Sequence, residues 1–320
     1  MQRISNDIID RMIQAKLTKC EMNLMLFLSF YQDEYGRVYG VHYKEACDAT
    51  GMSYQEFYNA KKSLVEKQFI CAEKSNRIDH DITIRNNAFL TREDDKRGYI
   101  NTGHNIFHTK EFYQLKAGSM LLALKLMKNT YDKRGYFKIG VKNFYEKYTQ
   151  IFGVTKRMLR YYLMQLKCFF SIGIKDGNYY IEPKKVIYKA PGGKSEAECL
   201  REQRAQAVLR RNRIKNVTSE QNEDIRTFFR QYEPTARDRG KKLFFLIDAA
   251  IASSIAGKKK RSLNMLLIHK LIRKNLFTDQ EDAHIKCSEN NQNQFLNINQ
   301  RNYYYDELER LLLNSQPQNI

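Results

Sequence analysis

The chain has 320 residues, 42% of them hydrophobic and only four of them proline, which is long enough for two or three folded domains and too apolar for a disordered chain. Its 55 lysines and arginines exceed its 36 aspartates and glutamates by 19, which predicts a polyanionic partner: nucleic acid first, an anionic membrane surface second. The longest apolar run, 243–256, is shorter than the roughly 20 residues of a membrane span, so we expect no membrane partner.

The N-terminal segment MQRISNDIIDRMIQAKLTK is amphipathic and contains acidic residues. Secretory and transit peptides have neither property in this combination, so we do not expect a targeting segment here. The element that follows, 21–31, is a strongly apolar stretch of helical length.

The sequence then repeats itself at an offset of 102 residues. Gly51 and Gly153 are each followed by Ser or Thr two residues later, by Leu 13 residues later, and by Ile six residues after that. Upstream, YGRVYGV at 35–41 matches RGYFKIGV at 134–141. We infer two copies of one unit of roughly 75–85 residues.

Both copies predict the same elements in the same order. In the first, these are a helix at 21–31, a strand at 38–41, a helix at 43–49, a third helix, and a hairpin with strands CAEK and ITIR around the polar loop SNRIDHD. Ser53 and Glu56 have the spacing of a capping box, which predicts that the third helix begins at Ser53.

The second copy predicts a helix at 118–129, a strand at 136–139, a helix at 142–150 and a third helix with Thr155 as its N-cap. Its hairpin reads FSIGIK-DG-NYYIEP, in which Asp176-Gly177 is a strong signal for a two-residue turn.

This order resembles that of winged helix-turn-helix proteins. YKEACDATGMSYQEFYNAKKSLVEKQFI and VKNFYEKYTQIFGVTKRMLRYYLMQLKCFFSI look like the positioning helix, turn, recognition helix and lead-in to the wing. Two such units on one chain resemble plasmid replication initiators, in which the first unit mainly mediates dimerisation and the second reads DNA repeats. The resemblance implies a mainly α fold with small β-hairpin wings: a first winged-helix domain at 1–100, a second at 104–189, a linker at 190–195 and a C-terminal helical domain at 196–320.

The charge is distributed unevenly along the chain. Residues 1–103 have a net charge of 0, residues 104–189 of +12, residues 190–275 of +11 and residues 276–320 of −4. A polyanion is therefore expected to meet the middle of the chain, in agreement with a second unit that reads DNA.

The third helix of the second copy divides into two faces. Helical spacing predicts that Leu159, Tyr162, Leu163 and Leu166 face the core, which leaves outward Lys156, Arg157, Arg160, Tyr161 and Met164. The resemblance implies that this outer face lies in the major groove, where Arg157 and Arg160 suit guanine and Lys156 suits a phosphate at the helix start. The alternative is an ordinary solvated face.

The same face of the first copy carries Tyr54, Gln55, Tyr58, Asn59 and Lys62. Gln and Asn can read adenine, so this face could also bind DNA; protein contact or plain solvent exposure is the alternative. In the second hairpin, Lys175 and Asn178 are expected to touch phosphate or the minor groove, while His80 in the first hairpin is interpreted as an ordinary loop histidine.

The last third of the chain predicts further helices. Residues 196–215 form a charged helix that is either a connector or a basic arm along the DNA backbone, and 219–232, 240–256 and 262–277 form a small bundle used for oligomerisation. The basic run 257–261 is a solvated loop or a phosphate contact, 287–300 is a polar loop, and 302–313 is an amphipathic segment that docks on the bundle or on a second subunit. A homodimer could form through the first winged helix or through these helices.

The motifs of common enzymes are missing from the sequence. It contains no GxxxxGK[ST], G-x-S-x-G or paired-histidine nuclease pattern, and its histidines form no HExxH or HxH. The six cysteines have no CxxC spacing, which favours reduced thiols in the cytoplasm. We therefore expect a protein that is not an enzyme and uses no metal or cofactor.

These patterns together predict a sequence-specific double-stranded DNA-binding protein, cytoplasmic, bacterial and associated with the nucleoid or a plasmid. The resemblance favours the initiation of DNA replication on a plasmid or mobile element through origin repeats. A winged-helix transcription regulator is the first alternative. A non-enzymatic scaffold whose winged helices contact proteins is the alternative of another class.

Overall fold

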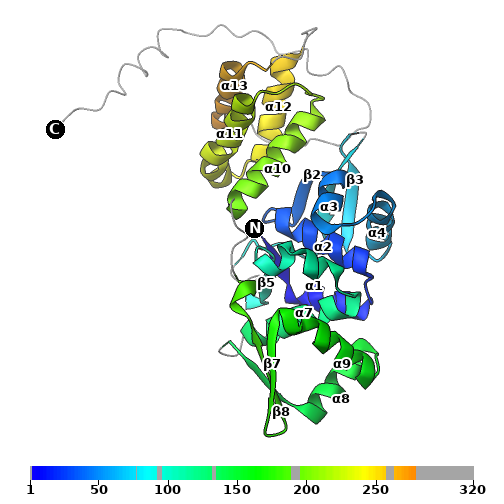
Figure 1. Cartoon of the computed structure of the whole chain (residues 1–320). Coiled ribbons are helices and arrows are strands. Elements are labelled where there is room, and N and C mark those ends of the chain that lie inside the picture. The colour runs from blue at the N-terminus through cyan, green and yellow to red at the C-terminus, as the bar shows by residue number, and fades with distance from the viewer. Residues whose placement is uncertain are drawn as a thin grey trace, which may run out of the picture. The chain divides into compact units, whose positions relative to one another are not determined.

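The structure, a computed structural model, describes residues 2–76, 78–91, 96–131, 135–188, 195–256 and 263–278. This part of the chain is mainly helical and contains small antiparallel sheets, as predicted (Figure 1). The predicted linker up to residue 194, the basic run 257–261 and the segments 287–300 and 302–313 lie outside the described residues.

The first copy contains every element that the sequence predicted. They are α2 (Lys19–Tyr31), β2 (Arg37–His42), α3 (Tyr43–Thr50), α4 (Tyr54–Glu66), β3 (Ile70–Lys74) and β4 (Asp79–Ile84), with the strands in the order β2-β4-β3. The hairpin loop is shorter than predicted, because the Asn76 side chain accepts from the amides of Ile78 and Asp79 at 2.7 and 2.8 Å and starts β4 early.

The second copy has the same order and the same topology. Its elements are α7 (Ala117–Tyr131), β6 (Phe137–Gly140), α8 (Val141–Phe152), α9 (Lys156–Gln165), β7 (Phe170–Lys175) and β8 (Asn178–Pro183), with the strands in the order β6-β8-β7. Asp176 and Gly177 have φ values of 49° and 70°, the two left-handed residues that a tight hairpin turn of this kind requires.

Local capping explains where the third helices begin. Ser53 and Glu56 form the predicted capping box at the start of α4, and the Thr155 hydroxyl accepts from the Met158 amide at the start of α9. The preceding helices end at Gly51 and Gly153, whose φ values of 72° and 62° favour glycine. Each pair of helices is therefore joined by a short turn that the sequence specifies.

The N-terminal segment joins the two copies. Strand β1 (Arg3–Ser5) pairs with β5 (Tyr99–Asn101), and α1 (Asn6–Gln14) packs its apolar side into the same core. Asp10 of α1 forms ion pairs with Lys125 and Lys128 of α7. A short helical stretch, η1 (Asn105–His108) and α6 (Lys110–Gln114), leads into the second copy. The hydrophobic core is continuous from α1 to β8, and the domain ranges 1–100 and 104–189 stay predictions.

The C-terminal helices form the predicted bundle with a core of its own. They are α10 (Glu196–Arg211), α11 (Ser219–Asp238), α12 (Leu243–Ile255) and α13 (Met265–Phe277). Helix α11 was expected to end at residue 232, before Pro234, but it continues to Asp238 because Ala236, beyond the proline, is buried in the bundle. None of the helices in the described ranges has both the length and the apolar character needed to cross a bilayer.

The bundle packs against strand β2 of the first copy. The Tyr39 ring stacks on Phe244 of α12 with centroids 4.6 Å apart, and the Gln203 side chain of α10 donates to the Tyr39 carbonyl at 2.8 Å. Gly40, next to it, has a φ of +61° at an irregularity in the β2–β4 register. A Cβ on Gly40 would lie 2.4 Å from the Ala207 Cβ, so only glycine permits this approach of α10.

Arg210 of α10 fixes the bundle to the first hairpin. Its Nε lies 3.1 Å from both carboxylate oxygens of Asp79, its Nη1 2.6 Å from Glu45, and its Nη2 2.9 Å from the Gly40 carbonyl. Asp79 is only 1% exposed, so its charge is compensated by this guanidinium.

Its neighbour Arg211 pairs with Asp81 of β4 at 3.1 Å and with Asp248 of α12 at 3.2 Å. Burial raises the pKa of the Glu45 and Asp248 carboxyls, and the adjacent guanidinium groups oppose that rise. Both arginines were predicted to lie in a connector or in a basic arm along DNA; their internal pairing favours the connector.

We expect Gly40→Ala to lower the free energy of unfolding by roughly 1–3 kcal/mol, since a methyl group at this position collides with α10. Gly51→Ala is the matched control, because Gly51 also has a positive φ of 72° but a Cβ added there would have no atoms within 4 Å. Urea unfolding of both variants measures the difference. Equal losses would show that the left-handed backbone, and not the packing of Ala207, decides the cost.

We expect Arg210→Leu to cost about 3–5 kcal/mol at pH 7, since it leaves buried carboxylates without their cation. Loss of the cation would raise the pKa of Glu45 further, and a raised carboxyl pKa gives stability at low pH that is lost as the pH rises through it. The gap to the parent protein should therefore widen between pH 4 and pH 7 in urea unfolding. Lys215→Leu, at an exposed lysine just after α10, should show no such dependence.

Candidate nucleic-acid interface

The inner face of α9 lies where the sequence predicted. Leu159, Leu163 and Leu166 are buried and Tyr162 is half-buried. The Tyr162 ring fills the space beside Gly118 of α7, where a Cβ would lie about 2.3 Å from the ring. Because this glycine lets the ring approach the α7 backbone, it sets how closely α9 packs on the second copy.

The outer face of α9 is exposed as a whole. Its residues are those proposed to touch DNA: Lys156, Arg157, Arg160, Tyr161 and Met164. Within the described ranges, none of its three cations forms an ion pair with a carboxylate. The face therefore offers three positive charges whose partners, if any, come from outside this part of the chain.

Two tyrosines that the sequence analysis did not single out orient Arg160. The guanidinium hydrogen-bonds to the Tyr145 hydroxyl of α8, which raises the pKa of Arg160. The Tyr145 hydroxyl in turn lies 3.0 Å from that of Tyr179 in β8, and burial raises the pKa of Tyr179 to about 12. The hydroxyls therefore stay protonated at neutral pH and connect α9 to the hairpin.

Tyr161 is also held in place. Gln165 donates to its hydroxyl at 2.9 Å, and the Lys116 ammonium lies 4.8 Å from the ring centroid. Gln165 is itself bonded to the Ser119 hydroxyl at 2.5 Å. Lys116, which precedes α7, thus adds a cation beside α9 that the helical spacing of α9 could not predict.

The hairpin of the second copy carries the predicted residues at its tip. Lys175 is exposed and lies opposite Asn178 in the β7–β8 register, and the Asn178 side chain donates to the Asp176 carbonyl at 2.8 Å. Strand alternation places this pair on one sheet face and Ile174 on the other, opposite Tyr179. Ile174 is 65% exposed, so the face that bears Tyr179 ends in an apolar side chain that the sequence analysis missed.

The corresponding face of the first copy differs in its polar contacts. Tyr54, Gln55, Asn59 and Lys62 are exposed, but Gln55 donates to Asn59 at 2.9 Å and Lys62 lies 4.0 Å from Glu66. Tyr58 is half-buried and contacts the rings of Tyr54 and Tyr43. The two amides proposed as adenine readers are thus bonded to each other.

His80 is not a loop histidine, as the sequence suggested, but a half-buried residue of β4. Its Nε2 lies 2.8 Å from the Lys61 ammonium, which must donate this hydrogen bond. Burial first, and then the charge of Lys61, lower the pKa of His80. The imidazole is therefore neutral at pH 7 and adds no positive charge to the first copy.

Among the described residues, no group of three or more His, Cys, Asp or Glu side chains is placed to hold a metal ion. Comparison of the chain with protein-family models, with curated proteins and with solved structures found no match.

Proposed function

We propose that this chain is a sequence-specific double-stranded DNA-binding protein with two tandem winged helices, of which the second reads the major groove through α9. The observation that carries the proposal is the exposed face of Lys156, Arg157 and Arg160, none paired with a carboxylate of the described chain. Arginine can donate two hydrogen bonds to guanine, and a lysine at a helix start favours phosphate.

The contrast between the copies supports this division of roles. On α4 the polar side chains are bonded to each other, whereas on α9 Arg160 is oriented by a tyrosine hydroxyl and remains exposed. The first hairpin is tied to the C-terminal bundle through Arg210, whereas the second hairpin ends in an exposed Lys175. A preoriented side chain loses less conformational entropy on binding than a freely rotating one.

The charge of the second copy supports an electrostatic contribution from the DNA backbone. Residues 104–189 have a net charge of +12, and neutralised phosphates release counterions. The logarithm of the binding constant should then fall with the logarithm of the salt concentration, with a slope of about −0.9 per phosphate. A scaffold that contacts proteins would show no preference for a duplex sequence.

We further propose that binding initiates replication of a plasmid or mobile element in the bacterial cytoplasm. The duplication and the charge difference between the copies support this role through the resemblance to plasmid initiators. Selection of bound fragments from the source genome tests it. Directly repeated sites at one origin support initiation, scattered promoter sites support transcription control instead, and failure to enrich any sequence contradicts both.

We expect Arg160→Ala to weaken binding to the selected duplex by roughly 1–3 kcal/mol and to relax the preference at one base position. Fluorescence anisotropy with the selected site and with single-base variants of it measures both effects. A loss that is equal for all sequences would reduce Arg160 to a phosphate contact. Lys62→Ala is the comparison in the first copy, and it should leave affinity unchanged unless α4 also reads DNA.

We expect Tyr145→Phe to weaken specific binding by about 0.5–1.5 kcal/mol, because it removes only the hydroxyl that orients Arg160. Binding to random duplex should not change. Tyr148→Phe is the matched control, since this tyrosine of α8 uses its hydroxyl to accept from Asn129 at 2.7 Å. In combination with Arg160→Ala, Tyr145→Phe should have no further effect; full additivity would contradict the positioning role.

A further inference from the structure

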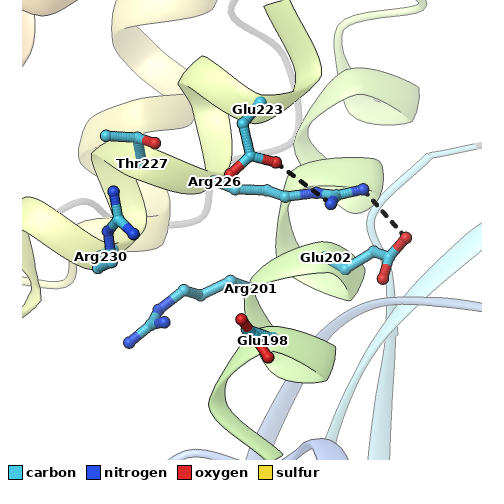
Figure 2. A pocket seen from close by; sticks show the side chains of 7 residues that line it. All are labelled: Glu198, Arg201, Glu202, Glu223, Arg226, Thr227 and Arg230. Carbon is cyan, nitrogen blue, oxygen red and sulfur yellow. Dashed lines mark hydrogen bonds and ion pairs between the residues drawn. The ribbon is translucent and has the colours of Figure 1, made fainter. Parts of the chain in front are cut away.

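A charged groove lies between α10 and α11 of the C-terminal bundle. It has a volume of about 140 Å³, and arginines reach it from both helices: Arg201 from α10, and Arg226 and Arg230, one turn apart, from α11 (Figure 2). Thr227 also lines it and adds a hydroxyl group.

The carboxylates around the groove have partners within the bundle. Glu202 and Glu223 pair with Arg226 at 3.0 and 3.4 Å. Glu198 accepts from the amide and the hydroxyl of Ser195 at 2.7 and 2.8 Å, as the carboxylate of the α10 capping box. The negative charges are thus engaged with Arg226 and with the helix start.

The other two arginines are different. Within the described chain, neither Arg201 nor Arg230 forms a hydrogen bond or an ion pair. The Nε atoms of Arg201 and Arg226 are buried without an acceptor, which is costly for a guanidinium group. Figure 2 shows Arg201 and Arg230 extending from their helices on the side away from the Arg226 ion pairs.

These groups suit a small anion with several acceptor oxygens. Two guanidinium groups and a hydroxyl offer more donors than one carboxylate can accept, whereas a phosphate group has enough oxygens and up to two negative charges. The segment 190–275 also carries a net charge of +11, which attracts such an anion.

We propose that the groove between α10 and α11 binds a phosphate group through Arg201, Arg230 and Thr227. The phosphate comes either from a nucleic-acid backbone or from a free nucleotide or inorganic phosphate. This site uses no residue of α9 and does not rest on the proposed DNA interface.

The test is titration of the full chain with inorganic phosphate at constant ionic strength, by calorimetry or by the chemical shifts of arginine side chains. Arg230→Gln removes an exposed guanidinium and should lower phosphate affinity about tenfold, the worth of a charge-assisted hydrogen bond. Arg201→Gln should do the same. Lys270→Gln, at an exposed lysine of α13 that does not line the groove, is the control and should bind phosphate like the parent protein.

A parallel titration with random duplex DNA distinguishes the two sources of phosphate. If the groove variants also lose DNA affinity relative to Lys270→Gln, the natural ligand is the backbone; if they lose only inorganic phosphate, it is a free phosphate compound. Equal phosphate affinity of Arg230→Gln and Lys270→Gln would overturn the proposal, even if Arg201→Gln fails to fold. Arg160→Ala should leave phosphate binding unchanged, so this site and the α9 interface fail independently.

Discussion

The buried carboxylate of Asp79 constrains how the first copy and the C-terminal helices are joined. A charge that is 1% exposed must be paired, and Arg210 supplies that pair from a helix 131 residues further along the chain. The same guanidinium also bonds Glu45 and the Gly40 carbonyl, so it joins β4, α3 and β2 to α10. Gly40 then allows α10 to lie against the strand. Since all these contacts depend on one side chain, the first hairpin acts as part of the bundle's attachment.

This constraint explains why two copies of one unit have different surfaces. The first copy uses Asp79, Asp81 and Glu45 to hold Arg210 and Arg211, and its net charge up to residue 103 is zero. The second copy has an Asp176-Gly177 turn in place of the acidic hairpin and keeps its tip exposed. A duplicated fold has thus diverged mainly in where its charges are paired.

Local features were predictable from the sequence and long-range ones were not. The caps at Ser53 and Thr155 and the turn at Asp176 depend on neighbouring residues, and all three were predicted. The burial of Leu159 and the exposure of Arg160 followed from helical spacing.

By contrast, the β1–β5 pairing, the core shared by both copies and the partners of Arg210 join residues far apart in the chain, which spacing cannot reveal. Tyr145 was missed for the same reason, although its place on the inner side of α8 was a usable signal. The net charge of a segment therefore says little about where its free charges lie. Of the arginines in the C-terminal helices, Arg204, Arg210, Arg211 and Arg226 are paired with carboxylates, so the segment's +11 overstates what a polyanion would meet there. On α9, no cation is neutralised by a described carboxylate, and each can displace a counterion from DNA. A surface with fewer but unpaired cations can therefore attract DNA more strongly than a more highly charged segment.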